Sequence, residues 1–142
     1  MSIMTERDRA AVRTEFEKLT GPVKLVVFSQ ELLAGDLCRQ SEALVREVAE
    51  LSDKLTVEVL NPAIDRERAG AYGVDQVPAI VVEGARDYGI RFYGIPSGYE
   101  FGNLIDSIVV ASTGQPALAE ETLATLRTLA ADVDIKVFST PT

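Results

Sequence analysis

The sequence is short of the residues that most often carry chemistry. Its 142 residues include a single cysteine and no histidine. Without histidine, the Ser-His and Cys-His arrangements of nucleophilic catalysis are excluded, together with most zinc chemistry. One cysteine cannot close a disulfide within the chain, so the sequence predicts a reducing, cytoplasmic location. We expect no cofactor and no metal site.

Long apolar runs and basic runs are also missing. A membrane-spanning helix needs about 18 or more apolar residues in succession, and no such stretch occurs. The N-terminal segment is charged from Glu6 onward and lacks the apolar core of a secretory signal. The net charge is −8, which argues against nucleic-acid binding because phosphate recognition needs a basic surface. We therefore expect neither nucleic acid nor a membrane as partner.

Hydrophobic periodicity and turn residues predict helices and strands along the whole chain. Helices are expected at 4–19, 36–51, 65–72, 101–114 and 118–130, and strands at 23–28, 54–60, 79–82, 87–93 and 133–138. Asp36 is the expected N-cap of the second helix. Leu37 is expected on the buried face of that helix, and four leucines are expected to face inward from the last helix: Leu118, Leu123, Leu126 and Leu129.

The central order of these elements is strand, helix, strand, helix, strand, strand, helix. Strands that alternate with helices and then form a hairpin indicate an α/β protein with a mixed sheet and helices on both faces. This is the element order of the thioredoxin fold. We predict that fold, with a four-stranded sheet, an extra N-terminal helix and a trailing helix plus strand.

Two stretches far apart in the chain are similar to each other. VKLVVFSQ occupies 23–30 and VDIKVFST occupies 133–140, and each follows a helix. Two tandem units of one fold would produce this similarity. We therefore predict a thioredoxin-fold unit over residues 1–114, followed at 115–142 by a trailing helix and the first strand of a truncated second unit.

Five blocks of the sequence carry a family resemblance. They are FEKLTGPVKLVVF (16–28), VREVAELSDKLTVEV (45–59), AYGVDQVPAIVV (71–82), YGIRFYGIPSGYEF (88–101) and DIKVFSTPT (134–142). The chain resembles the N-terminal unit of the glutaredoxin-like protein disulfide oxidoreductases, which have two tandem thioredoxin-fold units. It is also similar to the double thioredoxin-fold segment at the N-terminus of the alkyl hydroperoxide reductase flavoprotein subunit.

The resemblance implies a degenerate active site at the start of the second helix. Cys38 matches the resolving cysteine of the family's Cys-x-x-Cys motif, and Gly35 stands where the attacking cysteine belongs. We expect Asp36 to oppose thiolate formation by occupying the N–H donors of the helix start. Two interpretations of Cys38 stay open: a core residue, which we favour, or a monothiol that forms mixed disulfides.

The second family landmark is Val77-Pro78. In the thioredoxin fold a cis-proline faces the active-site helix, and the residue before it offers backbone hydrogen bonds to an extended peptide. The resemblance thus implies a substrate-binding role for Val77 and Pro78.

Three functions remain open at this point. The first is a redox-silent scaffold or binding unit, whose partner is a protein thiol or disulfide or a second thioredoxin-like unit. The second is a thiol–disulfide oxidoreductase, acting through Cys38 or through a Cys-x-x-Cys that follows residue 142. The third is a protein that forms a homodimer through its trailing helix and strand.

Overall fold

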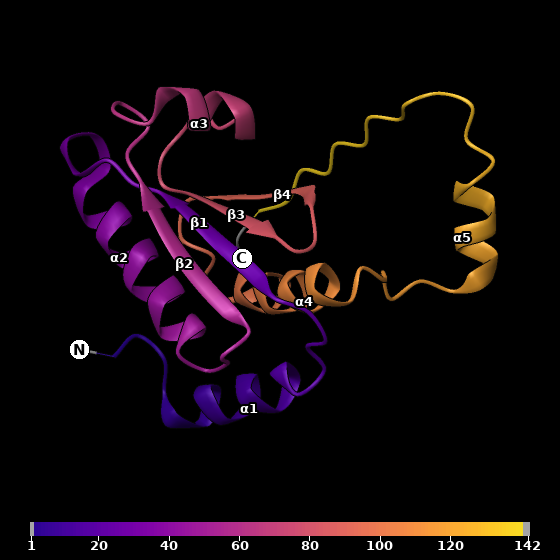
Figure 1. Cartoon of the computed structure of the whole chain (residues 1–142), viewed down its shortest axis with the longest axis horizontal. Coiled ribbons are helices and arrows are strands. Elements are labelled where there is room, and N and C mark those ends of the chain that lie inside the picture. The colour runs from indigo at the N-terminus through magenta and orange to yellow at the C-terminus, as the bar shows by residue number, and fades with distance from the viewer. Residues whose placement is uncertain (1, 141–142) are drawn as a thin grey trace.

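The computed structural model describes residues 2–140 and contains one four-stranded sheet with five helices (Figure 1). The elements in chain order are α1 (Glu6–Phe16), β1 (Val23–Phe28), α2 (Glu31–Ala49), β2 (Leu55–Leu60), α3 (Arg66–Tyr72), β3 (Ala79–Glu83), β4 (Asp87–Tyr93), α4 (Tyr99–Thr113) and α5 (Glu120–Leu126). The predicted element order of the central region is therefore confirmed.

The sheet has the strand order β2-β1-β3-β4. β1 runs parallel to β2 and antiparallel to β3, and β4 pairs with β3 as a hairpin with an irregularity at Val82/Glu83. β1 is a nearly continuous apolar run, as expected for a central strand that is buried on both faces. The mixed sheet and the α/β class agree with the sequence-based prediction.

Helices cover both faces of the sheet, but unequally. α1, α2 and α4 enclose the larger core on one face, built around Leu25, Val27, Ile80 and Leu104. Short α3 covers part of the other face, where Phe28 packs edge-on to Tyr72. This arrangement places the start of α2 and the start of β3 at the same end of the sheet (Figure 1).

Close backbone contacts hold α4 to the rest of the molecule. Ser112 Oγ accepts hydrogen bonds from the N–H groups of Thr20 and Gly21, each at 3.0 Å, and donates to the Gly21 carbonyl at 2.7 Å. At the β3–β4 turn, a Cβ on Gly84 would lie 2.0 Å from the Ala111 carbonyl oxygen. Only glycine fits there, so the hairpin turn lies directly against the last turns of α4.

The region after α4 differs from the prediction. α5 is shorter than the expected 118–130 helix, and Leu118, Leu126 and Leu129 are exposed instead of facing inward. Residues 133–138 are extended but pair with no strand among residues 2–140. The prediction failed because periodicity reports which side chains would share a face, but not whether any surface lies opposite them.

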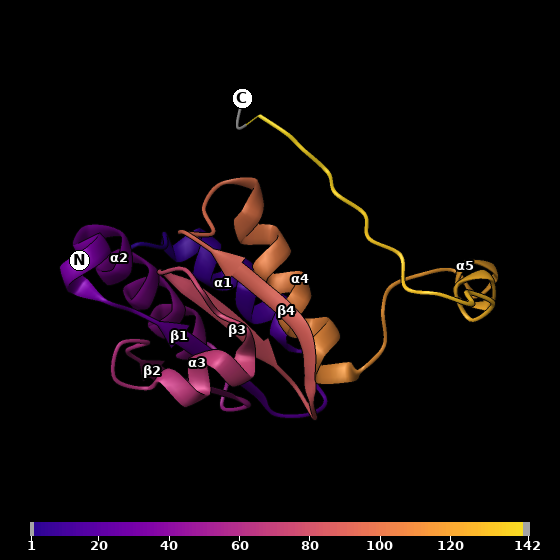
Figure 2. The ribbon, with the colours of Figure 1, turned by 90° about the horizontal axis from the view of Figure 1, so that it is seen from above.

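We call residues 114–140 the tail. Figure 2 shows the tail running apart from the sheet, with α5 at its outer bend, from which the chain runs back toward its C-terminus. The last two residues of the predicted 115–142 segment lie outside the described residues.

Candidate functional site

The start of α2 is not the simple loop and cap that the sequence suggested. The helix begins at Glu31 with a single turn, and Ala34 then departs from helical geometry at φ −143° and ψ 45°. The regular helix continues from Gly35. This break lets the chain turn sharply between β1 and the main part of α2, while keeping Cys38 on the inner face.

Cys38 is completely buried, and its thiol forms two hydrogen bonds with the backbone of one residue. The Gln30 N–H donates to Sγ at 3.4 Å, and the thiol donates to the Gln30 carbonyl at 3.7 Å. These two bonds join the inner face of α2 to the residue that follows β1 by only two positions. The thiol therefore stabilises the turn between β1 and α2 and has no access to solvent.

Gly35 lies on the more open side of the same helix. It is half-buried, and a Cβ built there would touch nothing nearer than the Arg39 guanidinium at 3.4 Å. A guanidinium at the end of a flexible side chain can move aside. The place that the family motif gives to the attacking cysteine thus has room for a side chain, but carries none.

Two expectations about this helix are wrong. Asp36 does not cap it: the carboxylate is exposed, makes an ion pair with Arg39 and accepts no backbone N–H from residues 2–140. Leu37 is half-exposed instead of buried. Both errors have one cause, because the helix starts at Glu31 instead of residue 36 and the break at Ala34 shifts the phase of its first turns.

Val77 and Pro78 lie opposite this helix start. The peptide bond between them is cis, and Pro78 is buried at the start of β3. The Pro78 carbonyl accepts the Gly94 N–H at 2.9 Å. Among residues 2–140, the N–H and C=O of half-buried Val77 have no hydrogen-bond partner. A backbone edge is therefore free beside the helix start.

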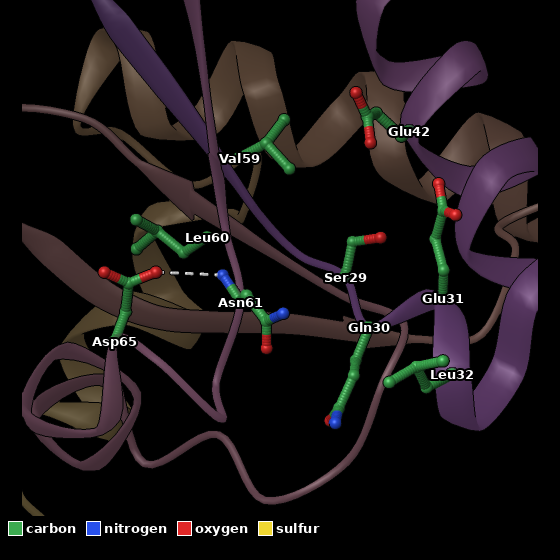
Figure 3. Close-up of a pocket in the computed structure, with 9 residues that line it drawn as sticks. All are labelled: Ser29, Gln30, Glu31, Leu32, Glu42, Val59, Leu60, Asn61 and Asp65. Atoms are coloured by element: carbon green, nitrogen blue, oxygen red, sulfur yellow. Dashed lines mark hydrogen bonds between the residues drawn. The ribbon is translucent and has the colours of Figure 1, made fainter.

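Two hollows flank the 30–34 segment. One, of about 480 Å³, lies between the helix start and the loop before Pro78 and is lined by Gln30, Leu33, Ala34, Pro62, Ala63, Val74, Asp75, Gln76 and Val77. The other, of about 420 Å³, is shown in Figure 3 and is lined by Ser29, Gln30, Glu31, Leu32, Glu42, Val59, Leu60, Asn61 and Asp65. The structure thus places Val77 and the helix start in one concave surface, whereas Cys38 lies beneath it.

The carboxylates around the second hollow have partners of their own. Glu42 pairs with Arg46 at 2.8 Å, and Asp65 accepts the Asn61 N–H at 3.0 Å, the dashed line in Figure 3. Glu31 lies 3.9 Å from Arg39. No group of histidine, cysteine, aspartate and glutamate in the described part of the chain is arranged to hold a metal ion.

Sequence reasoning missed the exposed apolar side chains here: Leu32 and Leu33 each line one hollow, and Ile64 follows Ala63, which lines the first. Leu32 is 96% exposed, Leu33 73% and Ile64 79%. Large apolar side chains gathered on a surface commonly mark a place where another molecule binds. Three apolar residues inside segments expected to be loops were the available signal. None of the helices described here is long and apolar enough to cross a membrane.

Part of the chain is similar in sequence to two probable thioredoxins. The chain is 40% identical over 57 residues to a probable thioredoxin of Methanothermobacter thermautotrophicus, which covers 40% of this chain and 62% of that protein. A probable thioredoxin of Methanothermobacter marburgensis matches at 41% over 51 residues, or 36% and 55% of the two chains. No family model matches the sequence.

Solved structures match over more of the chain. The alkylhydroperoxide reductase AhpF of Enterococcus faecalis (V583) superposes with a TM-score of 0.79 and 25% identity, over 89% of this chain and 61% of that one. A protein disulfide oxidoreductase of Aeropyrum pernix k1 gives 0.74 and 23%, over 88% and 55%. This chain thus spans less than two thirds of the length of these proteins. It has the thioredoxin fold and resembles one unit of the tandem thioredoxin-like domain of AhpF.

Proposed function

We propose that this chain is a redox-silent thioredoxin-like unit that binds protein segments without exchanging disulfides. The observation that carries the proposal is the state of Cys38: the thiol is fully buried and bonded to the Gln30 backbone, while Gly35 occupies the attacking position. Thiol–disulfide exchange needs an accessible thiolate that can reach the substrate sulfur. Neither position supplies one.

The binding surface in this proposal is the hollow beside Val77. The unpartnered backbone groups of Val77 suit an extended peptide, which offers the complementary N–H and C=O groups. Exposed Leu33 supplies apolar contact at the other side of the hollow. The occupant is therefore an extended, partly apolar segment of a protein partner.

The organisation of the protein is part of the same proposal. Residues 1–114 form the binding unit, and residues 115–142 are a trailing helix and the first strand of a truncated second thioredoxin-like unit. The cytoplasm is the proposed location, since a lone buried cysteine needs no oxidising compartment.

Thiol labelling tests the silent site directly. We expect a thiol-reactive dye to label Cys38 at least about a hundredfold more slowly in the native protein than in denaturant, because labelling requires opening of the structure. The Ile135→Cys variant adds an exposed thiol to the same molecule as an internal control. Rapid native labelling of Cys38 would favour the monothiol function instead.

A gain-of-function variant tests the assignment of Gly35. The wild-type chain should not reduce insulin disulfides, whereas Gly35→Cys should, because it adds a more accessible thiol three residues before Cys38, at the place of the family's attacking cysteine. Gly35→Ser is the matched control, since it fills the same space without a thiol. Insulin reduction by the wild type would contradict the redox-silent proposal, and the absence of any gain from Gly35→Cys would contradict the assignment of Gly35 to the attacking position.

Binding can be measured with a defined probe. Fluorescence anisotropy of labelled, reduced and alkylated insulin B chain would report an extended apolar segment without free thiols. Leu33→Asp should weaken its binding at least about tenfold, as for an apolar anchor at the centre of a contact. Leu129→Asp, the same change at an exposed leucine of the tail, should leave binding unchanged.

A second candidate function has support from the similarity of 23–30 to 133–140. The chain would be the inactive half of a two-unit disulfide oxidoreductase, with the active Cys-x-x-Cys after residue 142. Sequencing the coding DNA past codon 142 decides this: a Cys-x-x-Cys directly downstream supports it, and a stop codon excludes it.

A further inference from the structure

One side of the hollow beside Val77 is a short segment with few backbone contacts of its own. Residues 74–77 line the hollow in succession, and we call them the wall. Among residues 2–140, the backbone of 75–77 forms no hydrogen bond. The two ends of the segment are bonded: the Val74 N–H donates to the Ala69 carbonyl, and the Pro78 carbonyl accepts the Gly94 N–H, each at 2.9 Å. The path of the wall therefore depends on what holds its ends.

Tyr72, the last residue of α3, contacts three strands of the sheet just before the wall. Its ring packs edge-on against Phe28 of β1, and its hydroxyl donates to the Glu83 carboxylate of β3 at 2.6 Å. Its carbonyl accepts a hydrogen bond from Arg91 Nε of β4 at 3.0 Å, and the guanidinium lies 5.5 Å from the ring centroid. Gly73 then ends the helix with a φ of 66°. Tyr72 is thus the fixed point from which the wall starts.

Arg91 is itself held in one orientation. Its two terminal nitrogens donate to the Asp87 carboxylate at 2.8 and 2.5 Å, and one of them also donates to the Ile90 carbonyl at 3.0 Å. The side chain is 15% exposed. The planar guanidinium carries several donors in a fixed geometry, so it serves a carboxylate and a carbonyl at once, whereas an ammonium is a single point of charge. Arg91 therefore holds the Tyr72 carbonyl without giving up its own ion pair.

We propose that Arg91 is a positioning residue for this hollow: acting through Tyr72, it fixes the wall. The proposal rests on the proposed function, because it concerns the same binding surface. Arg91 does not itself line the hollow. β4 then supports both ends of the wall, since Gly94, which bonds to Pro78, directly follows that strand. A wall that is already ordered favours affinity, because a bound segment does not have to order it.

Amide hydrogen exchange, followed by NMR, tests this role without any ligand. We expect Arg91→Met to speed exchange at Val74 at least about tenfold, because the end of α3 and the wall open more often. A change that only lowered global stability would speed exchange in the core as well, for example at Val26 of β1. Exchange at Val74 that rises no more than exchange at Val26 would overturn the proposal.

Arg9→Met is the matched control for this measurement. Arg9 has the same exposed fraction as Arg91 and also pairs with carboxylates, but it lies on α1. We expect no local increase at Val74 in this variant, and an equal increase in the two variants would contradict the role of Arg91. Arg91→Lys carries the test if Arg91→Met does not fold. It keeps a positive charge beside Asp87 but loses the fork, so exchange at Val74 should still rise; wild-type exchange there would refute the proposal.

Binding gives a second readout, with labelled, reduced and alkylated insulin B chain as the probe. Both Arg91 variants should bind the probe at least about threefold more weakly, because the competent position of the wall is less populated. Arg9→Met should bind like the wild type. Equal binding by the wild type and the Arg91 variants would overturn the positioning role. A wild type that does not bind the probe would overturn the proposed function instead, and the exchange measurement would still decide whether Arg91 fixes the wall.

Discussion

Two similar stretches of the sequence have different structures in this molecule. VKLVVF forms β1, the central strand, with Phe28 fully buried between α3 and the sheet. VDIKVF, at 133–138, is extended and pairs with no strand in the described part of the chain, and the equivalent Phe138 is 91% exposed. The comparison teaches that a run of β-branched residues specifies the ability to form a strand. Partners on both sides decide whether the strand exists.

The largest expected difference in the free energy of unfolding is between alanine variants of the two equivalent phenylalanines. Phe28→Ala should lower the free energy of unfolding by about 3–5 kcal/mol, because it leaves a cavity in a closed core. Phe138→Ala should change it by less than about 0.5 kcal/mol, since the exposed ring contributes no core packing. Urea unfolding at low protein concentration measures both. A large loss for Phe138→Ala would show that the tail is part of the folded body.

A smaller contrast is expected between two hydroxyl groups. Ser112 Oγ holds the backbone of residues 20–21, directly before β1, whereas Thr125 Oγ donates to the Glu121 carbonyl within α5. Ser112→Ala should destabilise the protein by about 1–2 kcal/mol because two N–H groups lose their acceptor. The matched change Thr125→Ala should be close to neutral. Equal effects in thermal unfolding would contradict the idea that β1 depends on the anchoring of the segment before it.

The smallest expected difference concerns the contribution of ion pairs to the free energy of unfolding. An ion pair of the sheet should contribute in a pH-dependent way, and an ion pair of the tail should not. Lys24 of β1 and Arg68 pair with Glu58, and the hydrogen bonds from Arg68 lower the Glu58 pKa from 4.5 to about 2. A lowered folded-state pKa means that this stabilisation is present above about pH 4.5 and is lost as the pH falls toward 2. Glu58→Gln should therefore cost no more than about 1 kcal/mol at pH 7, since the pair is partly exposed, and nothing near pH 2.

The control for this prediction lies in the tail. Lys136 pairs with Asp134 in a solvated setting. Lys136→Gln should leave the unfolding free energy, measured by urea titration at low protein concentration, unchanged at both pH values. A stability difference for Glu58→Gln that stays constant between about pH 7 and pH 2 would show that ionisation of Glu58 is not its source.

Most of the folded body could be predicted from local sequence signals. The continuous apolar run of β1, the alternation in β2 and the positive-φ glycine Gly73 after α3 each specify their element with residues close by in the chain. The element order then leaves few ways to cover the sheet. The family resemblance identifies Val77-Pro78 with the cis-proline of the thioredoxin fold, and the structure has a cis peptide bond at that position.

The features that could not be predicted depend on contacts between residues that no local pattern relates. The bonds of the Cys38 thiol to Gln30 require the break at Ala34, and no motif predicts that break. Asp36 was expected to cap the helix because its residue type is favoured at N-caps, but an earlier helix start overrides that preference. The leucines of the tail are a further example. Their amphipathic spacing predicts a buried helix face, but spacing does not tell whether another element packs against that face.

The close approach of Gly84 to the Ala111 carbonyl has a mechanical consequence. Tension on the tail enters the folded body at Gly114, one turn beyond Ala111 and beside the hydroxyl of Tyr88. It is therefore transmitted directly to the β3–β4 turn and to the outer strand of the sheet. Pulling on the C-terminal segment would load this turn and, through the Ser112 hydroxyl, the segment directly before β1, while β2, at the far edge of the sheet, would bear the load last.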